Sequence, residues 1–240
     1  GVTIDRKTAA GYIQHAGLRP VLPVGKPQGF AHARSSRIDN AGLAGLIDIC
    51  RIYAVRMIRK PVCIGIPSAG SGTGYIKPYL LTPAGGFGVM AADYIEADQR
   101  GMPLSMAVLA PRTVRRIRDA TFPFAACENP VDLTASADDG MFGRSLDALI
   151  EDDGVDIIIC TAFFAPPAIS DGLIAEIAAR VPRSPKPLIT FTQYGPFTDL
   201  YLRRFHDAGV VGFPSVSRAV RAARFLVERA RILAALKEQP

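Results

Sequence analysis

A glycine-rich stretch that follows an apolar run is the part of this sequence best suited to chemistry. The apolar run 79–82 stops at Pro83, and a helical pattern of apolar residues begins directly after the stretch Ala-Gly-Gly-Phe-Gly. The first backbone N–H groups of a helix have no partner inside the helix and carry a partial positive charge, so this stretch predicts an anion site. Five residues make up this candidate site: Ala84, Gly85, Gly86, Phe87 and Gly88.

The stretch matches neither of the common nucleotide-binding motifs. It lacks the G-x-G-x-x-G spacing of dinucleotide-binding loops, and it lacks the Gly-Lys-Ser/Thr ending of a Walker A loop. Two interpretations are therefore open on local chemistry alone. The glycines form an anion site, or they only allow close packing in a tight turn between a strand and a helix.

The elements that must position this stretch follow a regular pattern. After residue 77, short apolar runs alternate with helical patterns, and the run 155–161 is rich enough in β-branched residues to predict a strand buried on both faces. This alternation predicts an α/β fold with a doubly wound, mostly parallel sheet, in which ligands bind at the carboxyl ends of the strands. Other strands are expected at 104–109, 187–192 and 210–213, and helices at 87–98, 111–119, 142–151, 170–181, 198–208 and 215–237.

The N-terminal part of the chain is less regular. Glycines and prolines interrupt residues 1–30, which predicts a loop-rich arm. A helix is expected at 40–56 and a short strand at 62–66, and the Gly/Ser-rich run 67–74 is typical of a linker. We therefore divide the chain into an N-terminal segment, 1–76, and a domain, 77–240.

The composition of the chain limits the kinds of function that it can have. The chain has 240 residues, 49% of them apolar, and its net charge of +6 is spread over several segments. This suits attraction of phosphorylated ligands, and we expect no nucleic-acid partner because no recognised binding module accompanies the charge. The four cysteines lack C-x-x-C spacing, which argues against a zinc site or a disulfide framework. No apolar run approaches about eighteen residues, and no signal-peptide pattern is present, so we expect no membrane span and a cytoplasmic location.

Five segments occur in the order and spacing of a known family. They are Leu-Thr-Pro-Ala-Gly-Gly-Phe-Gly-Val-Met-Ala-Ala-Asp at 81–93, Asn-Pro-Val-Asp-Leu-Thr at 129–134, and the runs 154–159, 186–189 and 208–220. Together they resemble the second flavodoxin-like domain of NDP-forming acyl-CoA synthetases, which are relatives of succinyl-CoA synthetase. The resemblance covers about 79–232, and its most specific piece is Asn-Pro-Val-Asp.

The resemblance implies a mechanism and a nucleophile. In that family acyl-CoA is converted to acyl phosphate, a histidine takes the phosphoryl group, and an ATP-grasp domain passes it to ADP, or the reverse. The family's histidine lies in a Ser-His-Thr-Gly segment, to which Gln-His-Ala-Gly at 14–17 corresponds by its distance from Arg-Ile-Asp-Asn at 37–40. His15 is therefore the candidate phosphoryl carrier, and residues 84–88 are its anion cradle, supported by Asn129 and Asp132. Gln14 and Ala16 replace the family's hydroxyl residues.

The resemblance also implies partners that this chain lacks. The segment 1–76 resembles the tail of a first flavodoxin-like domain, and neither a CoA-binding domain nor an ATP-grasp domain is recognisable. The complete enzyme would use CoA and ATP or ADP with magnesium on a carboxylic acid or its acyl-CoA, as an oligomer. We expect no cofactor bound tightly to this chain alone and no metal site in it. Two alternatives remain: a non-catalytic or degenerate subunit with a binding or regulatory role, and a stand-alone nucleotide-binding domain.

The other polar residues have simpler interpretations. His32 and His206 are expected to be surface or capping histidines, and Asp132 is expected to anchor a turn through backbone hydrogen bonds. The pair Asp138 and Asp139 is expected in a solvated turn. Three arginines of the last helix are expected to form a solvated face: Arg218, Arg221 and Arg224.

Overall fold

The computed structural model describes residues 76–97 and 104–237, with side chains described up to residue 228. The predictions for residues 1–75, including the helix at 40–56, the strand at 62–66, His15 and His32, lie outside the described residues. The described residues form an α/β fold around a five-stranded parallel sheet with strand order β2-β1-β3-β4-β5, as the sequence predicts. This is the flavodoxin-like order.

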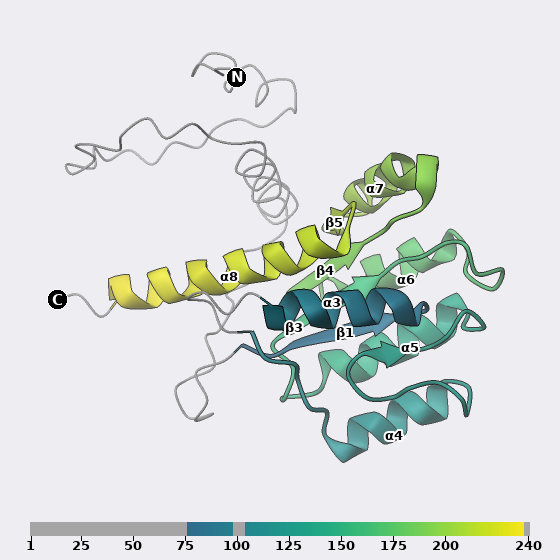
Figure 1. Ribbon diagram of the computed structural model, residues 1–240, viewed down its shortest axis with the longest axis horizontal. Coiled ribbons are helices and arrows are strands. Elements are labelled where there is room, and N and C mark those ends of the chain that lie inside the picture. Colours follow the sequence, from purple (N-terminus) through teal and green to yellow (C-terminus); the bar gives the residue numbers. More distant parts are fainter. Residues whose placement is uncertain (1–75, 98–103, 238–240) are drawn as a thin grey trace, which may run out of the picture. The chain divides into compact units, whose positions relative to one another are not determined.

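The elements alternate along the chain as expected (Figure 1). The strands are β1 (Pro78–Thr82), β2 (Val131–Asp132), β3 (Ile157–Thr161), β4 (Leu188–Phe191) and β5 (Gly212–Phe213). The helices are α3 (Gly85–Ala97), α4 (Pro111–Ala120), α5 (Asp139–Ile150), α6 (Gly172–Arg180), the short η2 (Gly195–Phe197), α7 (Thr198–Asp207) and α8 (Val216–Lys237).

Two apolar layers bury both faces of the sheet. In β3, Ile158 and Cys160 pack into the layer beneath α4, α5, α6 and α7, whereas Ile157 and Ile159 pack into the layer beneath α3 and α8. Figure 1 shows α3 and α8 together on one face. Because successive side chains of a strand point to opposite faces, a strand covered on both sides must be apolar throughout, which is why 157–161 is a continuous apolar run.

The segment 104–109 differs from the sequence prediction. It does not form a strand of its own and makes only an isolated parallel bridge between Leu104 and Ile76. Ser105 and Ala107 donate backbone hydrogen bonds to the carbonyls of Ile76 and Pro78, at 3.0 and 3.1 Å. The pairing stops there because the side chain of Asn129 lies between the two backbones and takes the next hydrogen bonds.

The predicted solvated face of α8 is wrong for one of its three arginines. Arg224 is only 5% exposed, and its guanidinium donates to the carbonyls of Tyr94 (2.8 Å) and Ile95 (3.0 Å) near the end of α3. The last carbonyls of a helix have no partner inside the helix and carry a partial negative charge, so a buried arginine is stable there. The periodicity of α8 could not reveal this contact, because it depends on where α3 ends.

The two acidic residues at the start of α5 make specific contacts and do not form only a solvated turn. Asp138 caps the helix by accepting a hydrogen bond from the backbone N–H of Met141, at 2.7 Å. Asp139 is the first residue of α5 and accepts a hydrogen bond from the backbone N–H of Ser170, at 3.0 Å. Asp138 thus caps α5, and Asp139 ties the start of α5 to the segment before α6.

Asp152 connects the end of α5 to the start of α4. Its buried carboxylate should make the stability of the fold sensitive to acid. Its buried carboxylate accepts hydrogen bonds from the backbone N–H groups of Ala110 (3.0 Å) and Gly154 (2.8 Å). Burial alone would raise the pKa of Asp152, but hydrogen bonds from Thr113, Gly154 and Ala110 outweigh burial and lower the pKa. A lowered pKa in the folded state means that the carboxylate stabilises the fold above its unfolded pKa of about 3.9.

We expect this stabilisation to be lost as the pH falls from about 4 through the lowered pKa of Asp152. Asp152→Asn should reduce the free energy of unfolding at pH 7 by about 1–3 kcal/mol and weaken its dependence on pH below 4. Urea denaturation between pH 7 and 3 measures both effects. Asp153→Asn is the matched control, because the Asp153 side chain is 99% exposed. Equal losses in the two variants would contradict the assignment.

The remaining expectations concern cysteines and membranes. Cys127 and Cys160 are buried free thiols, and burial raises the pKa of Cys160. Within 76–97 and 104–237, no helix is long and apolar enough to cross a membrane.

Candidate functional site

The predicted strand, turn and helix are present at the carboxyl end of β1. The hydroxyl of Thr82 accepts a hydrogen bond from the N–H of Ala84 (3.0 Å) and donates to its carbonyl (2.8 Å). The carbonyl of Ala84 also accepts from the N–H of Phe87, at 3.0 Å. These bonds close the turn at once, so α3 already begins at Gly85, two residues earlier than the apolar pattern predicts.

The three glycines of the stretch have different surroundings. A Cβ atom added at Gly85 would lie 2.4 Å from Oδ2 of Asp132, and one at Gly88 would lie 3.0 Å from Cβ of Pro130. A Cβ atom at Gly86 would have nothing within 4 Å. Gly85 and Gly88 are therefore required for close packing, whereas Gly86 leaves open space beside the first turn of α3. The packing interpretation thus holds for two glycines, and the third leaves room for a ligand.

Asp132 anchors the turn that follows β2, as the sequence predicts. Its Oδ1 accepts a hydrogen bond from the N–H of Thr134 (2.9 Å), and Thr134 has a φ of 69°. Its Oδ2 faces Gly85 and makes no hydrogen bond within the described part of the chain. An acidic side chain is stable at this end of α3 because the helix dipole favours negative charge there. An anion would have to bind on the Gly86 side, away from this carboxylate.

Asn129 ties three backbone segments together beside the candidate site. Its Oδ1 accepts a hydrogen bond from the N–H of Leu80 (3.1 Å), and its Nδ2 donates to the carbonyls of Pro78 (3.1 Å) and Ala107 (3.0 Å). The peptide bond between Asn129 and Pro130 is cis. Asn129 therefore supports the site by fixing β1 and the approach to β2, and does not reach the open side of Gly86.

Replacing Asn129 should destabilise the domain strongly. Asn129→Ala removes the partners of the Leu80 N–H and the Ala107 carbonyl and one of the two hydrogen bonds to the Pro78 carbonyl, which should lower the free energy of unfolding by about 2–4 kcal/mol. Asn129→Asp should be similarly damaging, because a carboxylate cannot donate to the two carbonyls. Denaturant titrations measure both values. A loss below about 0.5 kcal/mol in each variant, the usual range for surface substitutions, would show that water replaces the amide without cost.

Aromatic residues complete this edge of the sheet, and the sequence interpretation missed them. The ring of Phe87 meets Phe163 edge-on with centroids 5.5 Å apart and Phe191 at 5.6 Å. Phe163 in turn meets Tyr194 at 6.4 Å. The glycine-rich stretch is therefore joined by ring contacts to the segments that follow β3 and β4. Their place directly after two strands was the available signal, because ligands of such sheets bind at that edge.

Two relatives with named activities match nearly two thirds of this chain. The alpha subunit of ADP-forming acetate–CoA ligase II from Pyrococcus furiosus is 30% identical over 158 residues, which cover 63% of this chain and 33% of the relative. ADP-forming acetate–CoA ligase I from Archaeoglobus fulgidus is 34% identical over 155 residues, which cover 65% of this chain and 21% of the relative. This chain is therefore similar to ADP-forming acetate–CoA ligases over nearly two thirds of its length. No model of a known protein family matches it.

Solved structures share the fold of this chain. PH0766 from Pyrococcus horikoshii OT3 superposes with a TM-score of 0.61 at 21% identity, covering 94% of this chain and 44% of that protein. Acetyl-coenzyme A synthetase 1 from Ca. Korarchaeum cryptofilum, in complex with phosphate and ADP, has a TM-score of 0.56 at 22% identity. That match covers 68% of this chain and 35% of the synthetase. The chain thus spans between a fifth and a third of the two acetate–CoA ligases that it matches.

The other predicted features of this chain lie apart from the glycine-rich stretch. His206 lies near the end of α7, as predicted, beside a cleft of about 340 Å³ between α7 and β5. That cleft contains none of the predicted site residues: its lining is Asp199, Leu202, Arg203, His206, Asp207, Val210, Val211 and Gly212. Among residues 76–97 and 104–237, no three His, Cys, Asp or Glu side chains gather closely enough to hold a metal ion. The position of His15 relative to Gly86 lies outside the described residues.

Proposed function

We propose that this chain is part of an NDP-forming acyl-CoA synthetase that couples the interconversion of acyl-CoA and acyl phosphate to phosphoryl transfer between a histidine and ADP. The observation that carries the proposal is the open first turn of α3 at Gly86, at the carboxyl end of β1, in a chain 30% identical to an ADP-forming acetate–CoA ligase subunit. Backbone N–H groups aimed from a helix N-terminus stabilise a phosphoryl group without needing a charged side chain.

Each predicted residue has a role in this proposal. His15 carries the phosphoryl group, because neutral imidazole is a nucleophile at physiological pH. The loop 84–88 receives the phosphoryl oxygens, with Gly86 leaving room for them; the N–H groups of Ala84 and Phe87 already donate to Thr82 Oγ1 and to the Ala84 carbonyl. Asn129 holds β1, and Asp132 holds the turn against Gly85. The stretch fits a phosphoryl group, because a Cβ atom at Gly86 would meet nothing within 4 Å.

The proposal requires further domains. We assign 77–240 to a second flavodoxin-like domain and 1–76 to the tail of a first one, with CoA and ATP or ADP plus magnesium bound by CoA-binding and ATP-grasp partners. CoA would supply the thiol that forms the acyl thioester, and the nucleotide would accept or supply the phosphoryl group. The carboxylic acid or its acyl-CoA would bind outside the described residues.

The test is ATP formation by the full-length protein together with any CoA-binding and ATP-grasp polypeptides encoded beside it. With acyl-CoA, ADP, magnesium and phosphate, we expect ATP to form, and with phosphate left out we expect none. Acetyl-CoA is the first acyl donor to try, because the relatives are named for acetate. Failure with a panel of acyl-CoA substrates would contradict the ligase role.

The second candidate is a non-catalytic subunit with a binding or regulatory role. The replacement of the family's hydroxyl residues by Gln14 and Ala16 beside His15 favours it. It predicts acyl-CoA or partner binding without any phosphorylated protein. A stand-alone nucleotide-binding domain would instead bind ATP or a flavin at micromolar concentration, and isothermal titration of this chain with each ligand distinguishes it.

A further inference from the structure

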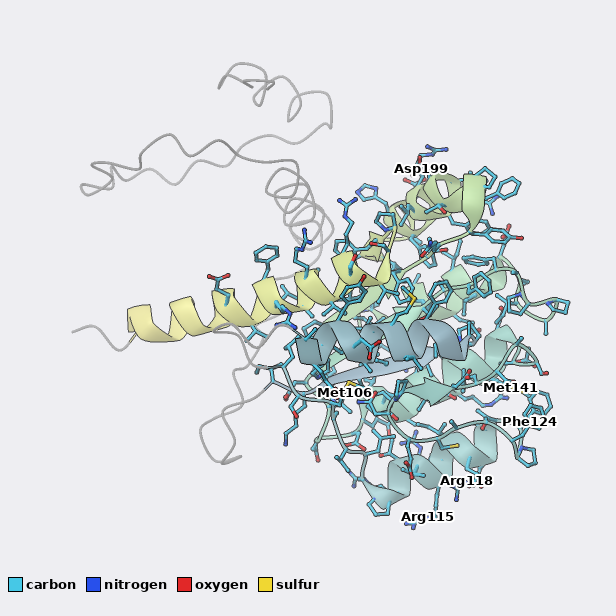
Figure 2. All side chains as sticks on the ribbon, in the orientation of Figure 1. Met106, Arg115, Arg118, Phe124, Met141 and Asp199 are labelled. Carbon is cyan, nitrogen blue, oxygen red and sulfur yellow. The ribbon has the colours of Figure 1, made fainter. Side chains whose placement is uncertain are left out.

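Helix α4 carries four arginines, and two of their side chains have no partner among the described residues. Of its four arginines, Arg112 pairs with Asp153 (3.6 Å) and Arg116 with Glu151 (2.5 Å). The side chains of Arg115 and Arg118 are exposed and make no ion pair or hydrogen bond within the described residues. Residues three apart lie on the same side of a helix, so these two charges face the same partner. Figure 2 shows both side chains pointing away from the sheet.

A stacked pair of phenyl rings follows the end of α4, one half-buried and one exposed. Phe122 and Phe124 stack with centroids 5.3 Å apart and planes 3° apart, and Phe124 is 65% exposed. A single exposed apolar side chain needs no explanation, but a stacked pair beside free arginines combines the residue types enriched at protein interfaces. We define the α4 patch as Arg115, Arg118, Phe122 and Phe124.

The distribution of charge around the patch favours a protein over a nucleic acid. Asp119 lies on α4 itself, and Glu151 and Asp153 pair with the neighbouring arginines. A nucleic-acid backbone carries a continuous row of negative charges and would meet these carboxylates. A protein surface can place its own carboxylates opposite Arg115 and Arg118 only, and can offer an apolar recess for Phe124.

We propose that the α4 patch is a docking surface for another polypeptide, whose contact face combines carboxylates with an apolar recess. The partner's carboxylates pair with Arg115 and Arg118, and its recess covers the stacked rings. The relative from Pyrococcus furiosus is named as one subunit of its enzyme, so proteins of this kind do assemble with other chains. The proposal is independent of His15 and of the glycine-rich stretch.

The test measures binding of three labelled probes to the full chain by fluorescence anisotropy. The probes are a peptide of glutamates around two leucines, the same peptide with serines in place of the leucines, and a single-stranded oligothymidylate. We expect the leucine peptide to bind most tightly. Arg115→Glu/Arg118→Glu should weaken its binding by at least about tenfold, and Phe124→Ser by about tenfold, because charge steers association and the apolar anchor holds the complex.

The controls separate the patch from general basicity. Arg203→Glu reverses one exposed charge on α7, far along the chain from α4, and should leave binding within about twofold. Circular dichroism and thermal unfolding verify that each variant is folded. Equal weakening by Arg203→Glu, equal binding of the leucine and serine peptides, or tighter binding of the oligothymidylate through Arg115 and Arg118 would each overturn the proposal.

Discussion

His15→Ala should abolish the phosphorylation of the complete enzyme. In the proposed mechanism the phosphoryl group passes through the His15 imidazole in both directions, so no other route joins acyl phosphate to ATP. We therefore expect no detectable acid-labile phosphorylation in His15→Ala. Removal of a single hydrogen-bond donor would instead reduce the rate only in part. The measurement is labelling with radioactive ATP and magnesium, followed by acid and alkali treatment. A phosphohistidine is lost in acid and survives alkali.

Two other histidines provide matched controls for this prediction. His32→Ala and His206→Ala should keep the acid-labile label, because His32 is expected at the surface and His206 lies near the end of α7 beside a separate cleft. Persistence of the label in His15→Ala would remove His15 from the mechanism and would leave the ligase role with another carrier. Absence of any label in the unaltered enzyme would favour the non-catalytic subunit.

The order of the elements could be predicted from the sequence because both faces of the sheet are covered. A strand such as 157–161 must then be apolar throughout, and its neighbours in the sequence must be helices long enough to cross back over the sheet. Helix starts were predictable where a local side chain caps them, as Ser215 does by accepting a hydrogen bond from the N–H of Arg218 at 3.4 Å.

The contacts that escaped prediction join residues far apart in the chain. Arg224 has the spacing of a solvated arginine, and only the end of α3, some 130 residues earlier, makes it a buried donor. Asn129 likewise stops the pairing with β1 beyond Ala107 through hydrogen bonds to Pro78 and Ala107. In the candidate site, the turn and its glycines could be predicted because they are local. The individual aromatic contacts of Phe87 could not, because they join it to Phe163 after β3 and to Phe191 at the end of β4, far along the chain.

Alanine at Gly85 and at Gly86 should have opposite effects, which makes the pair the most direct test of the anion site. In Gly85→Ala the new Cβ would lie 2.4 Å from Oδ2 of Asp132, a carboxylate held in place by the N–H of Thr134. The overpacking should lower the free energy of unfolding by about 1–3 kcal/mol. In Gly86→Ala the Cβ meets nothing within 4 Å, so stability should stay the same or rise by up to about 1 kcal/mol, since alanine favours a helix over glycine.

The rate of phosphoryl transfer should rank the two variants in the opposite order to their stability. The methyl group of Gly86→Ala would fill the space where the phosphoryl oxygens approach the backbone N–H groups, so labelling of His15 should slow by about ten- to a hundredfold in a fully stable protein. The measurements are urea denaturation of the chain and the rate of acid-labile labelling of the complete enzyme. In Gly85→Ala, labelling should fall only as far as the loss of folded protein explains.

A second substitution at Asp132 identifies the origin of the destabilisation. If the clash with Oδ2 is the cause, Gly85→Ala/Asp132→Ala should be more stable than the sum of the two single effects, because the carboxylate that Gly85→Ala must displace is absent. Strict additivity would place the strain elsewhere in the turn. A Gly86→Ala variant that is stable and labels at the normal rate would show that all three glycines serve the turn alone, because the open side of α3 would then receive no phosphoryl group.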